Sequence, residues 1–155
     1  MKELIRLKVN GQEYELAVDT HRTLLEVLRE QLGFVGTKNG CDQGECGTCT
    51  VLLDGKPVHS CLSLAVEAQG KNITTIEGLA KGDDLHPLQQ AFVDHGAIQC
   101  GFCTPGMIMS AKSLLDRNPS PTAHEIRRTI SGNLCRCTGY VKIIEAIKAV
   151  ADSNE

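Results

Sequence analysis

The chain has 155 residues, enough for one ordinary domain or two small ones, and its 41% hydrophobic content is normal for a folded protein. Its net charge is −3 with both signs interspersed, which excludes a basic surface that could follow a nucleic-acid backbone. We therefore expect no nucleic-acid partner. The N-terminal segment alternates charged and apolar residues, unlike a signal peptide, and no apolar run reaches membrane-spanning length. These features predict a cytoplasmic protein with no membrane span.

The first third of the chain is predicted to form β structure. Apolar residues alternate with charged or polar ones over residues 5–9 and again over residues 14–18. The Asn10-Gly11 pair between these segments is a strong signal for a two-residue hairpin turn. The two segments are therefore expected to pair as a hairpin with one face in water.

A helix and further strands are expected after this hairpin. Leucine and valine recur at helical spacing over residues 23–32, and Gly33 stands where such a helix would end. The Asp54-Gly55 pair predicts a turn between two short strands. Together these signals favour a small β-grasp-like sheet with one helix, the later strands lying at residues 50–53, 58–61 and 72–76.

The spacing of apolar residues changes to that of helices after Gly78. Apolar residues recur at helical spacing in residues 88–92, and the segment 140–151 is amphipathic. Thr104-Pro105 predicts a helix start, with the threonine as N-cap and the proline at the first helical position. A second, helical domain is therefore expected.

A capping box predicts one more helix in this second domain. Thr122 is followed three residues later by Glu125, and the preceding segment is rich in proline, which separates helices. We place the boundary between the domains so that the first spans residues 1–79 and the second spans residues 80–155.

The cysteines fall into two groups of four, one in each predicted domain. An even number could form disulfides, but thiols stay reduced in a cytoplasmic protein, and clustered reduced thiols usually bind metal. Four thiolates can hold one [2Fe–2S] cluster or one zinc ion. The first group is Cys41, Cys46, Cys49 and Cys61, and the second is Cys100, Cys103, Cys135 and Cys137.

The spacing of the first group is that of a plant-type ferredoxin, in which Cys-x4-Cys-x2-Cys is followed by a distant fourth cysteine. Zinc sites favour two tight pairs, and four residues between Cys41 and Cys46 are too many for the usual zinc knuckle. Gly40, Gly44 and Gly47 suit a loop that wraps around a cluster, because glycine adopts positive φ and lets N–H groups face sulfur. The second group consists of two tight pairs, and its spacing fits a cluster or a zinc ion.

Three motifs carry a family resemblance. In chain order they read GCDQGECGTCT at residues 40–50, QCGFCTPG at residues 99–106 and GNLCRCTGY at residues 132–140. Together they resemble the small [2Fe–2S] subunit of the xanthine dehydrogenase, carbon monoxide dehydrogenase and aldehyde oxidoreductase family of molybdenum hydroxylases, and the resemblance covers nearly the whole chain. It implies an α+β fold, in which an N-terminal β-grasp plant-type ferredoxin-like domain precedes a C-terminal four-helix-bundle domain. It also implies one [2Fe–2S] cluster in each domain, held by the two groups of four cysteines.

The resemblance further implies an electron-transfer subunit with no substrate site of its own. Its partners would be a large molybdopterin-binding subunit and a medium FAD-binding subunit, assembled as a dimer of heterotrimers. By resemblance Gln99 and Cys137 face the pterin. Thr48 departs from the family pattern, because alanine is usual between the glycine and the third cysteine of the first motif.

Several alternatives remain open at the level of sequence. The loop containing Asp42 and the segment 138–144 look somewhat like hydroxybenzoyl-CoA reductase small subunits, so this substrate class stands beside purine, aldehyde, N-heterocycle and carbon monoxide oxidation. A freestanding ferredoxin and a zinc-stabilised interaction module are the rivals from other classes. No catalytic residues are predicted, and the histidines have no mutual metal-ligand spacing, so we interpret them as structural or exposed: His21, His59, His86, His95 and His124.

Overall fold

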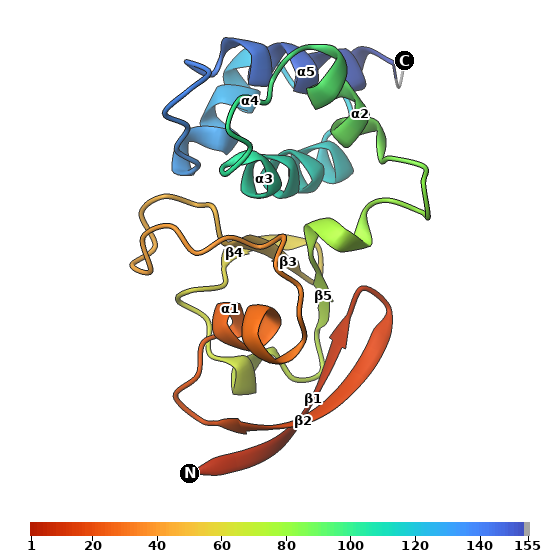
Figure 1. Cartoon of the computed structure of the whole chain (residues 1–155). Coiled ribbons are helices and arrows are strands. Elements are labelled where there is room, and N and C mark those ends of the chain that lie inside the picture. Colours follow the sequence, from red (N-terminus) through yellow and green to blue (C-terminus); the bar gives the residue numbers. More distant parts are fainter. Residues whose placement is uncertain (154–155) are drawn as a thin grey trace.

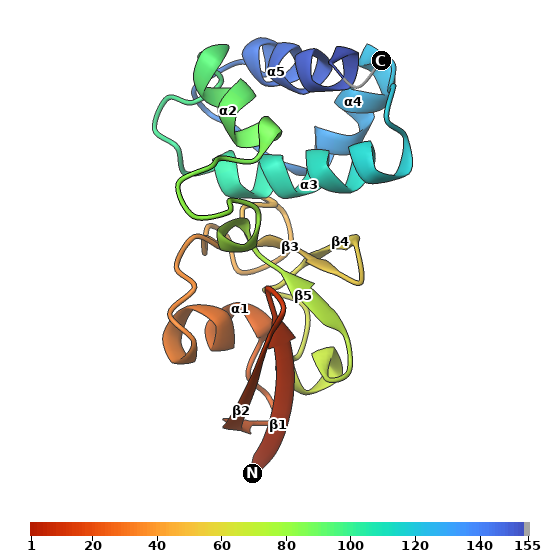
Figure 2. The same ribbon diagram turned by 90° about the vertical axis from the view of Figure 1, so that its right-hand side faces the viewer.

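The computed structural model describes residues 1–153 as a sheet-containing part with a layer of helices stacked on it (Figure 1). The N-terminus lies at the free end of the sheet part, and α5 near the C-terminus lies at the opposite end of the molecule (Figure 2). The predicted order of β structure followed by helices is confirmed. Within the described residues no helix has the length and apolar character needed to cross a bilayer.

The predicted N-terminal hairpin is confirmed. Strand β1 (Lys2–Val9) pairs antiparallel with β2 (Gln12–Asp19), and Val9 stands opposite Gln12 across the turn. Asn10 and Gly11 both adopt positive φ, 52° and 83°, which is the conformation that a two-residue type I′ turn requires. On β1 the buried side chains alternate with exposed ones, so the hairpin buries one face.

The remaining strands complete a five-stranded sheet with the order β2-β1-β5-β3-β4. Strand β5 pairs parallel with β1 and antiparallel with β3, so it joins the two hairpins. Three predicted strand boundaries are wrong. The tight Asp54-Gly55 turn pairs Leu53 with Lys56, so the fourth strand begins and ends two residues earlier than expected. The fifth strand ends two residues sooner than expected. These strands are β3 (Thr50–Leu53), β4 (Lys56–His59) and β5 (Asn72–Thr74).

The predicted helix over residues 23–32 consists of a short α-helix, α1 (Leu24–Glu26), continued by a π-helical turn, η1 (Val27–Gln31). Leu32 N–H donates to Val27 O at 3.1 Å, a five-residue step that widens the last turn. Gly33 then takes φ +75° and ends the helix as predicted.

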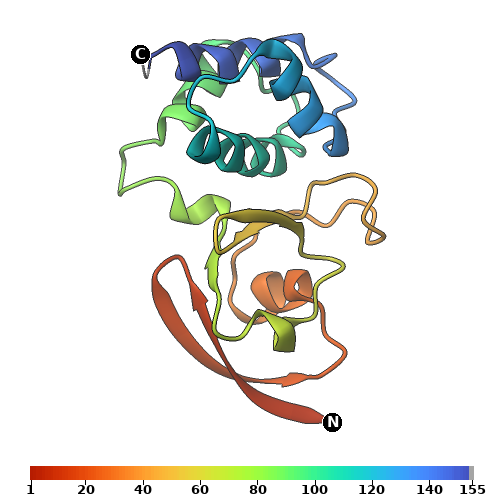
Figure 3. The ribbon, with the colours of Figure 1, turned by 180° about the vertical axis from the view of Figure 1, so that it is seen from behind.

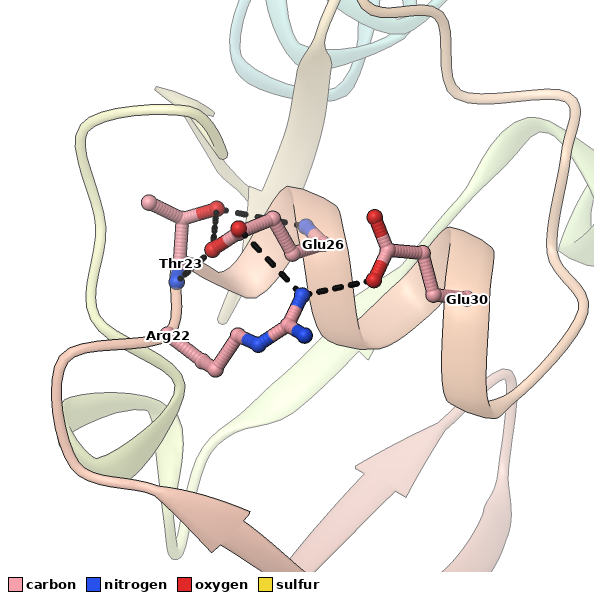
Figure 4. Close-up of polar contacts among 4 residues, drawn as sticks. All are labelled: Arg22, Thr23, Glu26 and Glu30. Atoms are coloured by element: carbon pink, nitrogen blue, oxygen red, sulfur yellow. Dashed lines mark hydrogen bonds and ion pairs between the residues drawn. The ribbon is translucent and has the colours of Figure 1, made fainter.

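A capping box and two ion pairs hold the start of this helix (Figure 4). The Thr23 hydroxyl accepts from Glu26 N–H at 3.2 Å, and the Glu26 carboxylate accepts from Thr23 N–H at 2.8 Å. Arg22 reaches Glu26 at 3.3 Å and Glu30 at 2.6 Å. Because these ion pairs are largely exposed, they contribute little beside the cap itself.

Four helices form the second layer: α2 (Pro87–Asp94), α3 (Thr104–Arg117), α4 (Ala123–Thr129) and α5 (Val141–Asp152). The capping box of Thr122 and Glu125 is confirmed at the start of α4. The predicted N-cap at Thr104 is wrong, because α3 begins one residue earlier and Cys103 occupies the cap. Three 3-10 turns complete the secondary structure of residues 1–153: η2 (Ala65–Ala68), η3 (Ile76–Gly78) and η4 (Ile130–Gly132).

Helix α3 is the helix that rests on the sheet part, lying along β3 and β4 (Figure 2). Leu52 of β3 belongs to the core of the helical layer, and Ser113 of α3 donates to Gly55 O at 3.0 Å. The segment after β5 runs along the outside of the molecule to α2 (Figure 3). The sheet has a separate core against α1, formed by aliphatic residues that include Ile5, Leu7, Val9, Leu24, Leu28 and Ile73.

Candidate functional site

The β3–β4 hairpin brings together two cysteines of the first group. Cys49 immediately precedes β3 and Cys61 follows β4 by two residues, so antiparallel pairing of Thr50 with His59 places both cysteines at the same end. Their thiols are hydrogen-bonded to each other, and both residues are at most 5% exposed. Burial, with the neighbouring Cys49 thiol, raises the pKa of Cys61 to about 12.

The other two cysteines of the first group lie on the loop that precedes β3. The Cys41 sulfur accepts from the N–H groups of Glu45 at 3.3 Å and Cys46 at 3.4 Å. Hydrogen bonds from the backbone of Gln43 and Cys46 lower the pKa of Cys41 to about 7, because they favour the thiolate. Gly44, at φ +78°, lets the loop turn in this way. The loop is therefore arranged to stabilise negative charge on sulfur.

Two side chains outside the cysteine group contact its sulfurs. The Thr48 hydroxyl lies 3.2 Å from the Cys46 sulfur. His59 Nδ1 lies 4.0 Å from the Cys49 sulfur. The sequence-based interpretation of this histidine as structural or exposed missed this contact. His86, in contrast, is structural as predicted: its Nδ1 accepts from Leu88 N–H at 3.2 Å and caps α2.

The second group comes from two loops of the helical layer. Cys100 and Cys103 lie just before α3, whereas Cys135 and Cys137 lie between η4 and α5. Cys103 is hydrogen-bonded to Cys135, and burial raises its pKa to about 12. Cys100 and Cys137 are exposed. The second group thus has an inner pair and an outer pair of thiols.

Thr138 and Tyr140 support the Cys135 loop. The hydroxyl and the N–H of Thr138 lie 3.1 Å and 3.4 Å from the Cys135 sulfur. Burial alone would raise the pKa of Cys135, because it favours the neutral thiol. The hydrogen bonds from Thr138 outweigh this effect of burial, and the pKa of Cys135 is lowered. Tyr140, at φ +71°, accepts from Cys135 N–H at 3.0 Å. A non-glycine residue with positive φ is costly, and here the strained position begins α5 directly beside the thiol loop.

The first loop, which precedes β3, and the second loop, which precedes α5, lie on the same side of the molecule. There residues 36–48 face the loop before α5 (Figures 1 and 3). Leu134 N–H donates to Cys46 O at 2.9 Å. A cavity of about 610 Å³ is lined from both sides, by Gly40, Cys46 and Thr48 of the first loop and by residues of the second, among them Cys100, Cys103 and Cys135.

Buried Asn133 holds the two loops together. Its Nδ2 donates to Gly47 O at 3.0 Å, and its Oδ1 accepts from the Ser110 hydroxyl at 2.8 Å. Gly47 and Gly106 permit this approach, because a Cβ on Gly106 would lie 2.4 Å from Gly47 O. Sequence reasoning did not single out Asn133, Thr138 or Tyr140, although all three stand within the GNLCRCTGY motif and the motif itself was the available signal.

The structure brings together Gln99 and Cys137, the two residues predicted to face a pterin. Gln99 Nε2 donates to Cys137 O at 3.2 Å, and both residues are exposed. The side chain of Gln99 thereby ties the segment before α3 to the segment before α5. Whether these residues face a pterin stays a prediction.

The donor chemistry of both groups fits a [2Fe–2S] cluster: four thiols each, with N–H or hydroxyl donors directed at sulfur. Among residues 1–153, no three histidine, cysteine, aspartate or glutamate side chains have the geometry of a site for a metal ion. Six of the eight thiols occur instead as contacting pairs: Cys41 with Cys46, Cys49 with Cys61, and Cys103 with Cys135.

Two known domain families match the chain. The 2Fe-2S iron-sulfur cluster binding domain matches residues 7–77, and the [2Fe-2S] binding domain matches residues 75–148. The chain is also 49% identical to the nicotinate dehydrogenase small FeS subunit of Eubacterium barkeri, an alignment that covers 95% of this chain and 94% of that subunit.

Solved structures are similar as well. A chain in the crystal structure of quinoline 2-oxidoreductase from Pseudomonas putida 86 has a TM-score of 0.95 and 50% identity, over 98% of this chain and 95% of that one. In the aldehyde oxidoreductase from Desulfovibrio desulfuricans (TM-score 0.94, 45% identity), the match covers 98% of this chain but only 17% of that chain. These relatives give no support to the hydroxybenzoyl-CoA reductase alternative. The chain belongs to the family of small [2Fe–2S] subunits of molybdenum hydroxylases, which includes those of xanthine dehydrogenases and aldehyde oxidoreductases.

Proposed function

We propose that this chain relays electrons between the molybdopterin site and the FAD of partner subunits through two [2Fe–2S] clusters. The observation that carries the proposal is the near full-length match to small FeS subunits, together with two groups of four cysteines on facing loops. A [2Fe–2S] cluster supplies reversible one-electron transfer, and the protein sets its potential through burial and hydrogen bonds to sulfur. The chain needs no substrate site for this role.

In this proposal each half of the chain binds one cluster. Residues 1–79 form a β-grasp plant-type ferredoxin-like domain, and residues 80–155 form a four-helix-bundle domain. The first ligand set is Cys41, Cys46, Cys49 and Cys61, and the second is Cys100, Cys103, Cys135 and Cys137.

The exposure of the second group supports the proposed placement of the partner subunits. Cys49 and Cys61 are buried, whereas Cys100 and Cys137 are exposed and so is Gln99, which contacts Cys137 O. We assign Gln99 and Cys137 to the face that meets a large molybdopterin subunit, and the loop of residues 41–49 to the side of a medium FAD subunit. A cytoplasmic dimer of heterotrimers is the corresponding assembly.

Purification through a tag on this chain tests the proposal. We expect two larger subunits to co-purify, and we expect four irons and four acid-labile sulfides per copy of this chain, with two distinct paramagnetic signals on reduction. A brown protein that purifies alone would favour a freestanding ferredoxin. A colourless protein with stoichiometric zinc would refute electron transfer and favour a structural zinc module.

A further inference from the structure

Thr48 occupies an unusual position between the two groups of cysteines. Its hydroxyl lies 3.2 Å from the Cys46 sulfur, and the residue is only 5% exposed. Thr48 and Cys46 also line the cavity that the first loop shares with Cys100 and Cys103. Thr48 thus places a hydroxyl group against the Cys46 sulfur, beside the cavity shared with the second group.

The direction of this hydrogen bond follows from the chemistry of the ligand. A cysteine that ligates iron is a thiolate and has no proton to give, so the hydroxyl must be the donor when Cys46 holds a cluster. The other acceptor near the Thr48 hydroxyl is Lys38 O at 3.4 Å, the longer of the two contacts. The sulfur is therefore the favoured acceptor.

Gly40 makes this contact possible. A Cβ at residue 40 would lie 2.8 Å from the Thr48 hydroxyl oxygen and 2.9 Å from the Cys46 sulfur, closer than real Cβ contacts. The absence of a side chain at Gly40 leaves the space in which hydroxyl and sulfur meet. The loop is thus shaped around this pair and not only around the cysteines.

A donor to a ligand sulfur affects the two redox states unequally. Reduction adds negative charge that is shared with the sulfur ligands, and a hydroxyl donor stabilises the more negative state more strongly. We propose, building on the proposed function, that Thr48 is a positioning residue whose hydroxyl donates to Cys46 Sγ and raises the reduction potential of the first cluster. The first cluster becomes a stronger electron acceptor as a result.

Redox potentiometry of the purified complex, followed by paramagnetic resonance, tests this inference. In Thr48→Ala we expect the ratio of reduced to oxidised first cluster at a fixed potential to fall by up to about tenfold, equivalent to about 59 mV for a one-electron couple. Thr48→Ser keeps a hydroxyl and should restore the wild-type potential. The potential of the second cluster should not change in either variant.

Thr50→Val provides a matched control two residues away, at the start of β3. Thr50 is also buried, but its hydroxyl donates to Gly47 O at 2.7 Å and not to sulfur, so its loss should leave the first potential unchanged. Equal shifts of the first potential in Thr50→Val and Thr48→Ala would overturn this inference, and so would no shift in Thr48→Ala with both clusters present. Either result would leave the proposed function standing. Absence of the first cluster from the wild-type complex would overturn the proposed function and this inference with it.

Discussion

Replacing Gly106 by Ala should destabilise the protein, although the same change in an ordinary helix is stabilising. Gly106 lies in the first turn of α3, where alanine has the better helix propensity by about 1 kcal/mol. A Cβ at this position would lie 2.4 Å from Gly47 O and 3.1 Å from Thr48 Cα. Since real Cβ atoms essentially never come within 3.0 Å of such an atom, the helix and the loop must separate by roughly half an ångström.

The carbonyl of Gly47 is not free to yield. It accepts from Asn133 Nδ2 at 3.0 Å, from the Thr50 hydroxyl at 2.7 Å and from Thr50 N–H at 3.2 Å. Overpacking of this kind costs about 1–3 kcal/mol, which exceeds the propensity gain in most of that range. Because three hydrogen bonds fix this carbonyl, the cost should lie in the upper part of that range, about 2–3 kcal/mol. Subtracting the propensity gain of about 1 kcal/mol leaves an expected net loss of about 1–2 kcal/mol in the free energy of unfolding.

Urea unfolding followed by circular dichroism measures this loss, with Gly132→Ala as the matched control. Gly132 lies in η4 near the same junction, but a Cβ there meets nothing within 4 Å, so Gly132→Ala should be neutral or slightly stabilising. If Gly106→Ala unfolded at the same urea concentration as wild type or higher, the close approach of α3 to the first loop would be refuted.

Three further predictions concern single side chains. Cys46→Ala should lower iron and sulfide from four each to two each and remove one of two paramagnetic signals. The second cluster should remain, because residue 46 contacts the second loop through its backbone carbonyl, which the substitution keeps. Loss of both signals would contradict this prediction. Tyr140→Phe removes the acceptor of Cys135 N–H and should destabilise by about 1–3 kcal/mol, with faster loss of the second cluster to a chelator than of the first. Bonds from the backbone and hydroxyl of Thr23 lower the pKa of Glu26, so its stabilisation is present above the unfolded Glu pKa of about 4.3 and is lost as pH falls through the lower folded value. The difference in thermal midpoint between wild type and Glu26→Gln should therefore be largest near pH 7 and shrink toward pH 3, and a constant difference would refute it.

Features fixed by neighbouring residues could be predicted from the sequence. Asn10-Gly11 determines its hairpin because both residues tolerate positive φ, and Thr122 with Glu125 forms a capping box through a three-residue span. The spacing of the cysteines likewise separates them into two groups. For the hairpin and the capping box, the signal and the structure that it specifies lie within a few residues of one another.

Features that depend on tertiary contact could not be predicted. Nothing local to Asn133 indicates that its amide will meet Gly47 O, 86 residues away in sequence. Cys103 replaced Thr104 as the N-cap of α3 although its side chain makes no capping hydrogen bond, so cap propensity gave the wrong residue. Nor does the position of Thr48 next to Cys49 in the sequence reveal that its hydroxyl contacts the sulfur of Cys46.

The last prediction concerns the surface beside the second group. Gln99 Nε2 donates to Cys137 O at 3.2 Å in an exposed position, and an exposed hydrogen bond to a carbonyl contributes only about 0.5–1.5 kcal/mol. Both clusters should therefore assemble in Gln99→Ala with nearly normal spectra. Reduction by substrate should slow, because Cys137 O loses the donor that orders it at the proposed pterin face, whereas reduction by an artificial donor on the flavin side should stay near wild type.

Rapid-mixing absorbance with both reductants, on one preparation of the complex, separates this role from simple support of the loop. Gln90→Ala is the matched control, because Gln90 is also exposed and donates to Asp94 at 2.8 Å on α2, remote from the thiols, and neither reduction rate should change. If Gln99 only supported the loop, its loss would alter the spectrum of the second cluster and leave substrate-driven reduction intact. That outcome would contradict the assignment of Gln99 to the pterin face. A residue that orders the site where electrons enter the chain must change the rate of reduction by substrate, even where the spectrum of the second cluster stays normal.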